Sequence, residues 1–317
     1  MEKVWYNVSM DSFFYVSKSF ADLLKEPEEP KRGDFFDRGR ESQLLYNEEV
    51  RILREEKDWY YVEALEQLSY RQVGFWAPYR GWVRKDDISA YKMKLSFNSV
   101  VRSPTCLIES ESGDTILLFG TYVKAEYFSD RTLVYLGEEK GKLKAGSIEL
   151  LKKEVRVAPS LLTQSARLFN GCPYLFGGRS MSLRELNVDG RLTGVDCSGF
   201  VNLLFRAYGI RIPRDAYEQF IVSKKIKGKE LSPGDLIFIS PKDEREIVNH
   251  VMVYLGEGFF IEASSREKKV KEGSFMDRFS IEVSSIEDER IDVGESFLSF
   301  GRVLSDEQDR TDRLKKS

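Results

Sequence analysis

The sequence predicts a multidomain protein in which a β-rich N-terminal half precedes an α+β domain. With 317 residues the chain exceeds one small domain and suits two or three compact units. Between about residues 40 and 155, short β-like runs alternate with turns, which indicates small β-barrels or sandwiches. From residue 156 onward, apolar residues recur at helical spacing instead. We therefore expect a new domain to begin near residue 156.

Amino-acid composition and net charge argue against nucleic acid and membranes as binding partners. Hydrophobic residues make up 41% and charged residues 32% of the chain, as in soluble globular proteins. The formal net charge is only -3, so no whole-protein field attracts nucleic acid or an anionic membrane surface. No run of 18 apolar residues is present, and the first 20 residues lack the pattern of a signal peptide. We expect a cytoplasmic protein with neither nucleic acid nor membrane as partner; composition says nothing of its oligomeric state.

Cysteine and histidine usage limits the chemistry. Cys106, Cys172 and Cys197 are too few for a disulfide framework, and neither a Cys-x-x-Cys pair nor a histidine cluster suggests a metal site. We expect reduced thiols, no metal and no organic cofactor. Because His250 is the single histidine, any Cys–His mechanism has one possible base. Cys106 and Cys172 carry no further signal and are interpreted as small core residues.

The N-terminal half divides into two β-rich segments. The first, residues 1–95, has an N-terminal extension and contains SQLLYNEEVRILREEKDWYYVEAL followed by GWVRKDDI. This order of turn, WYYV and GWV resembles a bacterial SH3 domain, which implies a small β-barrel. The second segment, residues 96–155, follows a similar plan and ends in GSIELL. We therefore expect two SH3-like domains in tandem.

The third predicted domain covers residues 156–305, and a charged tail follows at 306–317. Its first element is a predicted amphipathic helix in APSLLTQSARLFNG, which stops at Gly171, a typical C-terminal cap residue. The apolar residues at helical spacing in this segment are Leu161, Leu162, Ala166 and Phe169.

The segment TGVDCSGFVNLLFRAYGI places Cys197 at the start of a second predicted helix. One apolar face is predicted, made of Phe200, Val201, Leu204, Phe205 and Tyr208. At a helix N-terminus the free N–H groups and the helix dipole favour a thiolate over a thiol, so Cys197 is a candidate nucleophile. The alternatives are a buried, inert cysteine and, for Asp196, a simple N-cap.

The segment IVNHVMVYLGEGFFIEAS predicts two strands joined by a glycine turn. Alternation places His250 on the same face as Val248, Met252 and Tyr254, and we expect that face to look toward the helix. A hairpin centred on Gly256 sets Glu262 directly opposite His250. A hairpin centred on Glu257 sets Ser264 opposite and leaves Glu262 diagonal.

In both registers Glu262 shares a face with His250. A carboxylate there would accept the Nδ1–H of the ring, fix its tautomer and stabilise the imidazolium. The alternative interpretation is a surface glutamate on a strand. The sequence therefore predicts a triad of Cys197, His250 and Glu262.

Four motifs in order, PYLFGG, DCSGF, PGDLIF and HVMVYLG, resemble the NlpC family of papain-like cell-wall peptidases over residues 156–305. The resemblance implies an α+β papain-like domain with Cys197 as nucleophile and His250 as base. It assigns the third, orienting position to Glu262, where the family usually has His, Asn or Gln. The insertion RSMSLRELNVDGRLTG before the DCSGF motif is long for the family, and it either lines the cleft or loops outward.

SH3-like domains before such a catalytic domain resemble the γ-D-glutamyl-L-diamino-acid endopeptidases that recycle cell-wall peptides. This resemblance implies hydrolysis of the γ-D-glutamyl–diaminopimelate bond in peptidoglycan-derived peptides with a free N-terminal L-alanine. Asp196 matches the residue that binds the free amine, and Tyr79 in APYRGW matches a tyrosine that closes the cleft. The other matching positions that line the site are Tyr174, Ser198 and Asp215.

Two other functions remain open from the sequence. The same Cys–His pair serves amidases and acyltransferases with different pockets. Glu262 departs from the family pattern, which also allows a wall-peptide binding module whose catalytic site has decayed.

Overall fold

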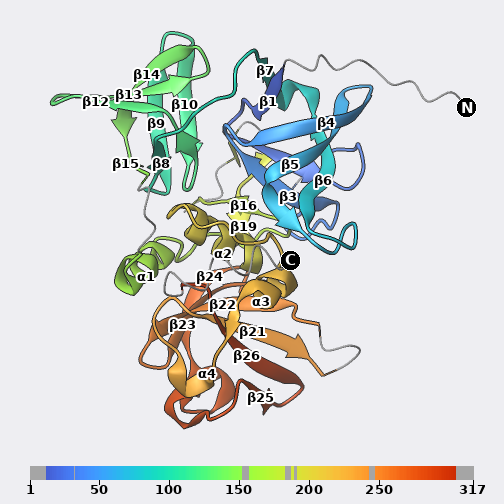
Figure 1. Ribbon diagram of the computed structural model, residues 1–317, viewed down its shortest axis with the longest axis vertical. Coiled ribbons are helices and arrows are strands. Elements are labelled where there is room, and N and C mark those ends of the chain that lie inside the picture. The colour runs from blue at the N-terminus through green and yellow to red at the C-terminus, as the bar shows by residue number, and fades with distance from the viewer. Residues whose placement is uncertain are drawn as a thin grey trace, which may run out of the picture. The chain divides into compact units, whose positions relative to one another are not determined.

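The computed structural model describes residues 12–31, 33–151, 157–182, 187–188, 191–242 and 247–304 (Figure 1). The chain separates into two compact units. Unit 1 comprises Met1–Leu68, Pro78–Leu151 and Phe176–Thr193, and unit 2 comprises Ser69–Ala77, Lys152–Leu175 and Gly194–Ser317. The predicted tail at 306–317 and the first 11 residues of the predicted extension lie outside the described residues.

The larger sheet of unit 1 has seven strands in the order β3-β2-β6-β5-β4-β1-β7. Its strands are β1 (Phe13–Val16), β2 (Phe20–Leu24), β3 (Arg40–Leu45), β4 (Glu49–Glu56), β5 (Trp59–Ser69), β6 (Ala77–Arg84) and β7 (Ile88–Tyr91). A short 3-10 helix, η1 (Lys85–Asp87), precedes β7. The predicted WYYV and GWV runs therefore form β5 and β6.

The remaining strands of unit 1 form two smaller sheets, one of five strands (β10-β9-β14-β13-β12) and one of three (β11-β8-β15). They are β8 (Ser99–Val101), β9 (Thr105–Ser110), β10 (Gly113–Leu118), β11 (Tyr122–Val123), β12 (Ala125–Tyr127), β13 (Thr132–Leu136), β14 (Glu139–Ala145) and β15 (Ile148–Leu150). The N-terminal half is thus mostly sheet, as predicted. Pairings among its described strands leave the sheets open, so the SH3-like barrels stay a prediction.

Aromatic residues of the SH3-like motif fill the core of unit 1. Trp59 and Trp82 are buried and pack together with Leu24. Tyr79 is also buried, in a separate cluster built around the β-sheet residues Leu23 and Val62. Burial of these large rings supplies much of the hydrophobic stabilisation of a small β-rich unit.

The long insertion belongs to unit 1. Its described residues include the short strands β16 (Arg179–Ser180), β17 (Asn187–Val188) and β18 (Arg191–Leu192). The fully buried Arg179 donates to Glu48 at 2.5 Å, and Arg191 donates to Asp87 at 2.6 Å. These ion pairs attach the insertion to the N-terminal sheets, so it neither loops freely outward nor groups with the predicted domain 156–305.

Unit 2 combines helices with one antiparallel sheet. The helices are α1 (Pro159–Arg167), α2 (Cys197–Arg206), α3 (Ala216–Val222) and α4 (Phe275–Phe279), with 3-10 turns η2 (Gly228–Glu230) and η3 (Val283–Ser285). The strands are β19 (Gly194–Val195), β20 (Lys224–Lys225), β21 (Leu236–Pro241), β22 (His250–Gly256), β23 (Phe259–Ser264), β24 (Lys269–Ser274), β25 (Arg290–Val293) and β26 (Ser296–Arg302). None of the described helices is long and apolar enough to cross a membrane.

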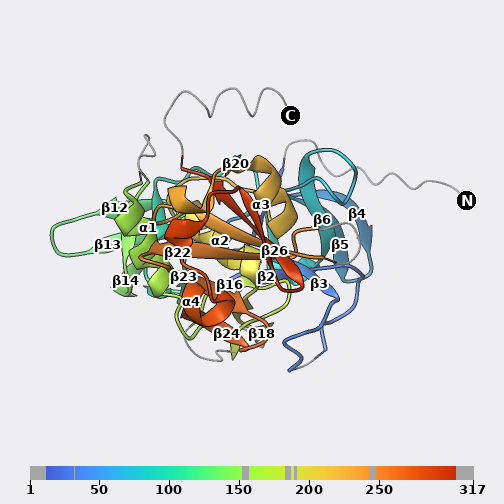
Figure 2. The same ribbon diagram turned by 90° about the horizontal axis from the view of Figure 1, so that it is seen from below.

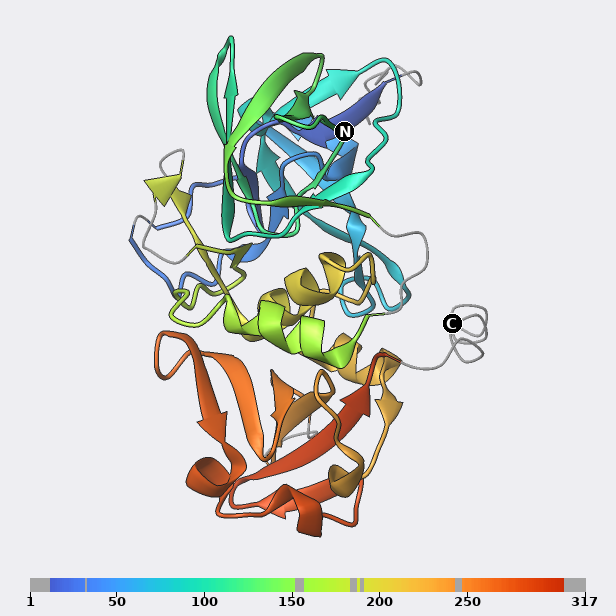
Figure 3. The ribbon, with the colours of Figure 1, turned by 90° about the vertical axis from the view of Figure 1, so that its left-hand side faces the viewer.

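The sheet of unit 2 runs β20-β26-β21-β22-β23-β24, with β25 paired to β26 (Figure 2). Helices α1 and α2 lie beside each other and both contact β22 (Figure 3). Helix α1 matches its prediction at the buried residues Leu162 and Ala166, whereas Leu161 is 45% exposed. Gly171 has a φ of +83°, which explains why the chain turns there.

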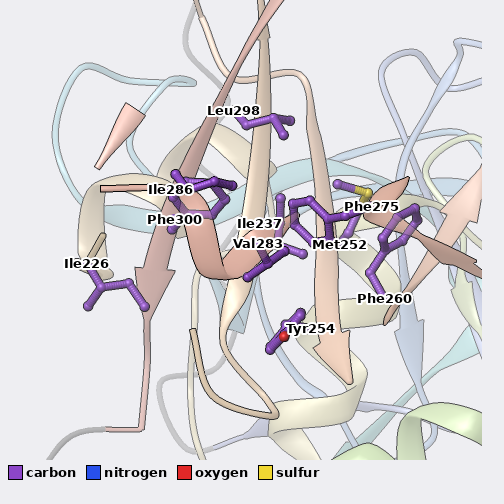
Figure 4. Close-up of a cluster of buried hydrophobic side chains, with 10 residues drawn as sticks. All are labelled: Ile226, Ile237, Met252, Tyr254, Phe260, Phe275, Val283, Ile286, Leu298 and Phe300. Carbon is purple, nitrogen blue, oxygen red and sulfur yellow. The ribbon is translucent and has the colours of Figure 1, made fainter. Parts of the chain in front are cut away.

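One hydrophobic cluster of unit 2 lies on the sheet face that carries Met252 and Tyr254 (Figure 4). Its other members come from the neighbouring strands, α4, η3 and adjoining loops: Ile226, Ile237, Phe260, Phe275, Val283, Ile286, Leu298 and Phe300. The row that we expected to face the helix after Cys197 therefore packs largely toward α4. The prediction was wrong for Met252 and Tyr254, because α4 covers this face of the sheet.

Unit 2 also includes a segment from the N-terminal half, Ser69–Ala77. The fully buried Glu218 of α3 explains why. Its Oε1 accepts hydrogen bonds from the Ser69 hydroxyl at 2.9 Å and from the backbone N–H groups of Tyr70 and Arg71 at 2.6 and 2.9 Å. The continuous domains predicted from the sequence miss this exchange because hydrogen bonds between distant segments leave no local pattern.

Candidate active site

Cys197 is the first residue of α2, as predicted. Asp196 is the N-cap, and its Oδ1 accepts a 2.6 Å hydrogen bond from the backbone N–H of Gly199. The helix therefore starts at the candidate nucleophile because the preceding side chain satisfies one of its free N–H groups. The residues of the predicted apolar face that belong to α2 are buried, as are all ten residues of this helix.

His250, the first residue of β22, lies between Cys197 and Glu262. Its Nε2 is 2.6 Å from Oε2 of Glu262, and the thiol of Cys197 also hydrogen bonds with the ring. Because Glu262 occupies Nε2, Nδ1 is the nitrogen that faces Cys197. The predicted contact between Glu262 and Nδ1 was wrong, because the ring orientation depends on where the start of α2, with Cys197, lies relative to the sheet.

Strand register explains how Glu262 reaches the histidine. In the β22–β23 hairpin, Val253 pairs with Ile261 and Tyr254 with Phe260, which corresponds to the register centred on Glu257. Glu257 has a φ of +52°, so the turn falls at this residue. Glu262 is therefore diagonal to His250 on the same face, and its side chain is only 2% exposed. The interpretation of Glu262 as a surface residue was wrong.

Charges and hydrogen bonds favour the ionised forms of both side chains. Burial lowers the pKa of His250, but hydrogen bonds and charges from Cys197 and Glu262 outweigh it and raise this pKa to about 9. Burial raises the pKa of Glu262, yet His250 and Arg278 outweigh it and lower this pKa to about 2. At neutral pH the site therefore favours a carboxylate beside an imidazolium, which can stabilise a thiolate and donate a proton.

Asp196 forms a second charged group beside the nucleophile. Arg214, whose side chain is fully buried, donates to both carboxylate oxygens of Asp196 at 3.0 and 2.8 Å. It also donates to the hydroxyl of Ser198 at 3.0 Å, and that hydroxyl donates to Asp196. The bidentate pair fixes the N-cap and hence the first turn of α2.

Replacing Arg214 by Met should destabilise the protein by about 3 kcal/mol, because it leaves a largely buried carboxylate without its cation. The measurement is urea unfolding followed by circular dichroism. Arg211→Met, at an exposed arginine three positions earlier, is the matched control and should change stability by less than about 0.5 kcal/mol. A loss below about 1 kcal/mol for Arg214→Met would show that the pair does not stabilise the helix start.

The remaining residues predicted to line the site, Tyr174, Asp215 and Tyr79, lie in different parts of the chain. Tyr174 forms a parallel bridge with Val195, two residues before the nucleophile, and Asp215 is the N-cap of α3. Tyr79 belongs to unit 1, where its hydroxyl donates to Glu41 at 3.1 Å. Roles in substrate binding for these three residues stay predictions.

Sequence reasoning missed two arginines of the site. Arg214 directly precedes the predicted Asp215, and Arg278 of α4 bonds to Oε1 of Glu262. Arg278 gave no signal, because α4 is a five-residue helix without a recognisable motif. Both arginines could have been sought in the sequence only as cations that neutralise the carboxylates of Asp196 and Glu262.

Comparison with known proteins places this site in a family. Residues 171–285 match the model of the NlpC/P60 family. Over 242 residues, 73% of this chain and 74% of the relative, the chain is 24% identical to the gamma-D-glutamyl-L-lysine dipeptidyl-peptidase of Bacillus subtilis. It is 33% identical over 127 residues to the peptidoglycan endopeptidase RipB of Mycobacterium tuberculosis, covering 39% of this chain and 51% of RipB.

A solved structure shares the fold over nearly the whole chain. It is an NlpC/P60 family protein from Bacillus cereus, with a TM-score of 0.75 and 20% sequence identity. The match covers 93% of this chain and 100% of that one. The architecture of a sheet-rich N-terminal region joined to this α+β unit is therefore one that a known protein also has.

Proposed function

Residues 171–285 form an NlpC/P60 cysteine peptidase domain, and from that premise we propose that the chain hydrolyses the γ-D-glutamyl–diamino acid bond of peptidoglycan-derived peptides. The observation that carries the proposal is the His250 ring held between the thiol of Cys197 and the carboxylate of Glu262. Two similar Bacillus proteins are named gamma-D-glutamyl-L-lysine dipeptidyl-peptidases, which supports this choice of bond. Diaminopimelate is the diamino acid that we propose.

In the proposed mechanism, the Cys197 thiolate attacks the γ-carbonyl carbon of the D-glutamyl residue. Backbone N–H groups at the start of α2 stabilise the oxyanion that forms. The C–N bond then breaks, and the His250 imidazolium protonates the leaving amine. A water molecule next gives a proton to the neutral imidazole and attacks the thioester. The C–S bond breaks, which releases the glutamyl carboxylic acid and regenerates the thiolate–imidazolium pair, and the acid then loses its proton to solvent.

Mass-spectrometric product analysis tests the bond. Incubation with L-Ala-γ-D-Glu-diaminopimelate should release free diaminopimelate and the dipeptide L-Ala-D-Glu. Transfer of the glutamyl group to an added amine without net hydrolysis would favour an acyltransferase instead. Binding without any product would favour a peptide-binding module.

Asp196 is proposed to bind the free amine of the substrate. Its Oδ1 already accepts from three donors, whereas Oδ2 accepts from Arg214 and retains a lone pair for one more donor. Its side chain keeps 14% exposure, so an ammonium group can approach from solvent. A peptide whose alanine is linked to a glycan has no such cation to offer.

N-acetylation of the tripeptide should therefore lower kcat/KM by about tenfold or more, the value of a charge-assisted hydrogen bond. Asp196→Asn should abolish the preference between the free and acetylated peptides. Circular dichroism must first confirm that this variant folds, because Asp196 also caps α2. Equal kcat/KM for the two peptides with the unmodified protein would contradict the assignment.

For the N-terminal half we propose two SH3-like domains, supported by the WYYV and GWV runs in β5 and β6 and by the sheet-rich fold. Closure of the cleft by Tyr79 is proposed on the family resemblance alone, and a cytoplasmic location is proposed on the sequence pattern alone. A Tyr79→Phe variant would test the first, since loss of the hydroxyl should raise KM if it contacts the peptide.

A further inference from the structure

Arg278 is held firmly beside the third residue of the triad. Its Nη1 bonds to Oε1 of Glu262 and lies 3.6 Å from Sδ of Met252. The guanidinium carbon lies 5.6 Å from the ring centroid of Phe260 and 5.2 Å from that of Phe279. These contacts orient the cation from several sides, although its side chain is 35% exposed.

The two oxygens of Glu262 have separate partners. Oε2 contacts Nε2 of His250 and Oε1 contacts Arg278, so the carboxylate bridges the imidazole and the guanidinium. A carboxylate at 2% exposure is costly without a cation. His250 can supply a positive charge only while it is protonated, whereas arginine is always charged. Arg278 therefore compensates Glu262 throughout a reaction in which His250 gains and loses its proton.

We infer that Arg278 is a positioning residue that acts through Glu262 and sets the pH range over which Cys197 and His250 form a thiolate–imidazolium pair. The inference rests on the proposed roles of these two residues. By pairing with Glu262, Arg278 weakens the attraction of this carboxylate for the imidazolium. This keeps the protonated ring from becoming too stable to act later as a base.

The charged groups around His250 determine in which direction each substitution should shift its pKa. Cys197 faces the ring from α2 and Glu262 from β23, and the neighbour on β21 is the apolar Ile239. Arg278 on α4 acts through Glu262, and Asp196 beside Cys197 is already paired with Arg214. Removing Arg278 should raise the pKa of His250, whereas neutralising Glu262 should lower it.

The experiment follows the rate of alkylation of Cys197 by iodoacetamide against pH, with the modified peptide identified by mass spectrometry. This readout reports the ion pair and requires no peptide cleavage, so it remains informative if the proposed substrate is wrong. Arg278→Met should shift the midpoint of its His250-dependent phase upward by about one pH unit, and Glu262→Gln should shift it downward by about as much. Because Arg278 acts through Glu262, the double variant should stay within about half a unit of the Glu262→Gln midpoint, and a return to the original midpoint would overturn the route through Glu262.

Controls separate this role from simple stabilisation. Arg167→Met, which removes an arginine paired with Glu272 at 3.2 Å in the same unit, should leave the profile unshifted. Arg278→Lys keeps the charge and should remain close to the original midpoint. Arg278→Gln replaces the Met variant if circular dichroism shows that Met is not tolerated. Reduced amplitude without a shift, or shifts of the same sign in both single variants, would overturn the inference.

Discussion

Cys197→Ala is expected to reduce turnover of the tripeptide by about a million-fold, to the limit of detection, because no other group supplies the nucleophile. Cys197 is the first residue of α2 and contacts the single histidine of the chain. Serine at this position should be nearly as inactive, since a hydroxyl ionises far less readily than a thiol. The measurement is the initial rate of diaminopimelate release.

Cys172→Ala is the matched control for this prediction. Cys172 is a fully buried cysteine of the same unit, and its replacement should leave kcat within about threefold. Turnover that survives in Cys197→Ala at more than about 1% would mean that another group attacks the substrate, and the proposed mechanism would be wrong.

The second large effect is expected at Glu262. Glu262→Ala removes the acceptor for Nε2 of His250 and leaves Arg278 without its carboxylate partner. We expect kcat to fall by about a thousandfold or more, as when an orienting carboxylate is lost from a triad. Glu262→Gln keeps an oxygen that can accept the Nε2 hydrogen, so its loss should be about tenfold.

Glu272→Ala controls for the Glu262 variants. Glu272 lies on the adjacent strand β24, pairs with Arg167 near the surface and should affect kcat by less than about twofold. If Glu262→Ala retained the activity of the unmodified protein, the carboxylate would be a structural residue, and the triad would reduce to a Cys–His dyad.

Local patterns predicted the start of the site well. A small polar residue before an apolar helical run placed Cys197 at a helix N-terminus, and period-two alternation placed Glu262 on the face of His250. Both features depend on residues close in sequence. The register remained open between two values, because the bulge near Gly256 depends on backbone angles that a glycine-containing turn leaves unspecified.

Features set by distant segments could not be predicted. Which nitrogen of His250 meets Glu262 depends on how α2 packs against the sheet, and the partner of Glu262 comes from α4. In the fold, the burial of all of α2 likewise follows from packing on several sides rather than from its own sequence. Sequence periodicity describes one element at a time, whereas these contacts join three or four.

The hydrogen bonds that Glu218 receives from Ser69, Tyr70 and Arg71 limit how far the peptidase region can be separated from the N-terminal half during gene recombination. A cassette that begins after residue 155 encodes every motif of the peptidase but omits the donors for a carboxylate with no solvent exposure. The isolated product would lose these three hydrogen bonds to a carboxylate, each worth roughly 1.5–3 kcal/mol. Exchange of the N-terminal half for an unrelated module would therefore be selected against unless the new module supplied an equivalent of the 69–77 segment.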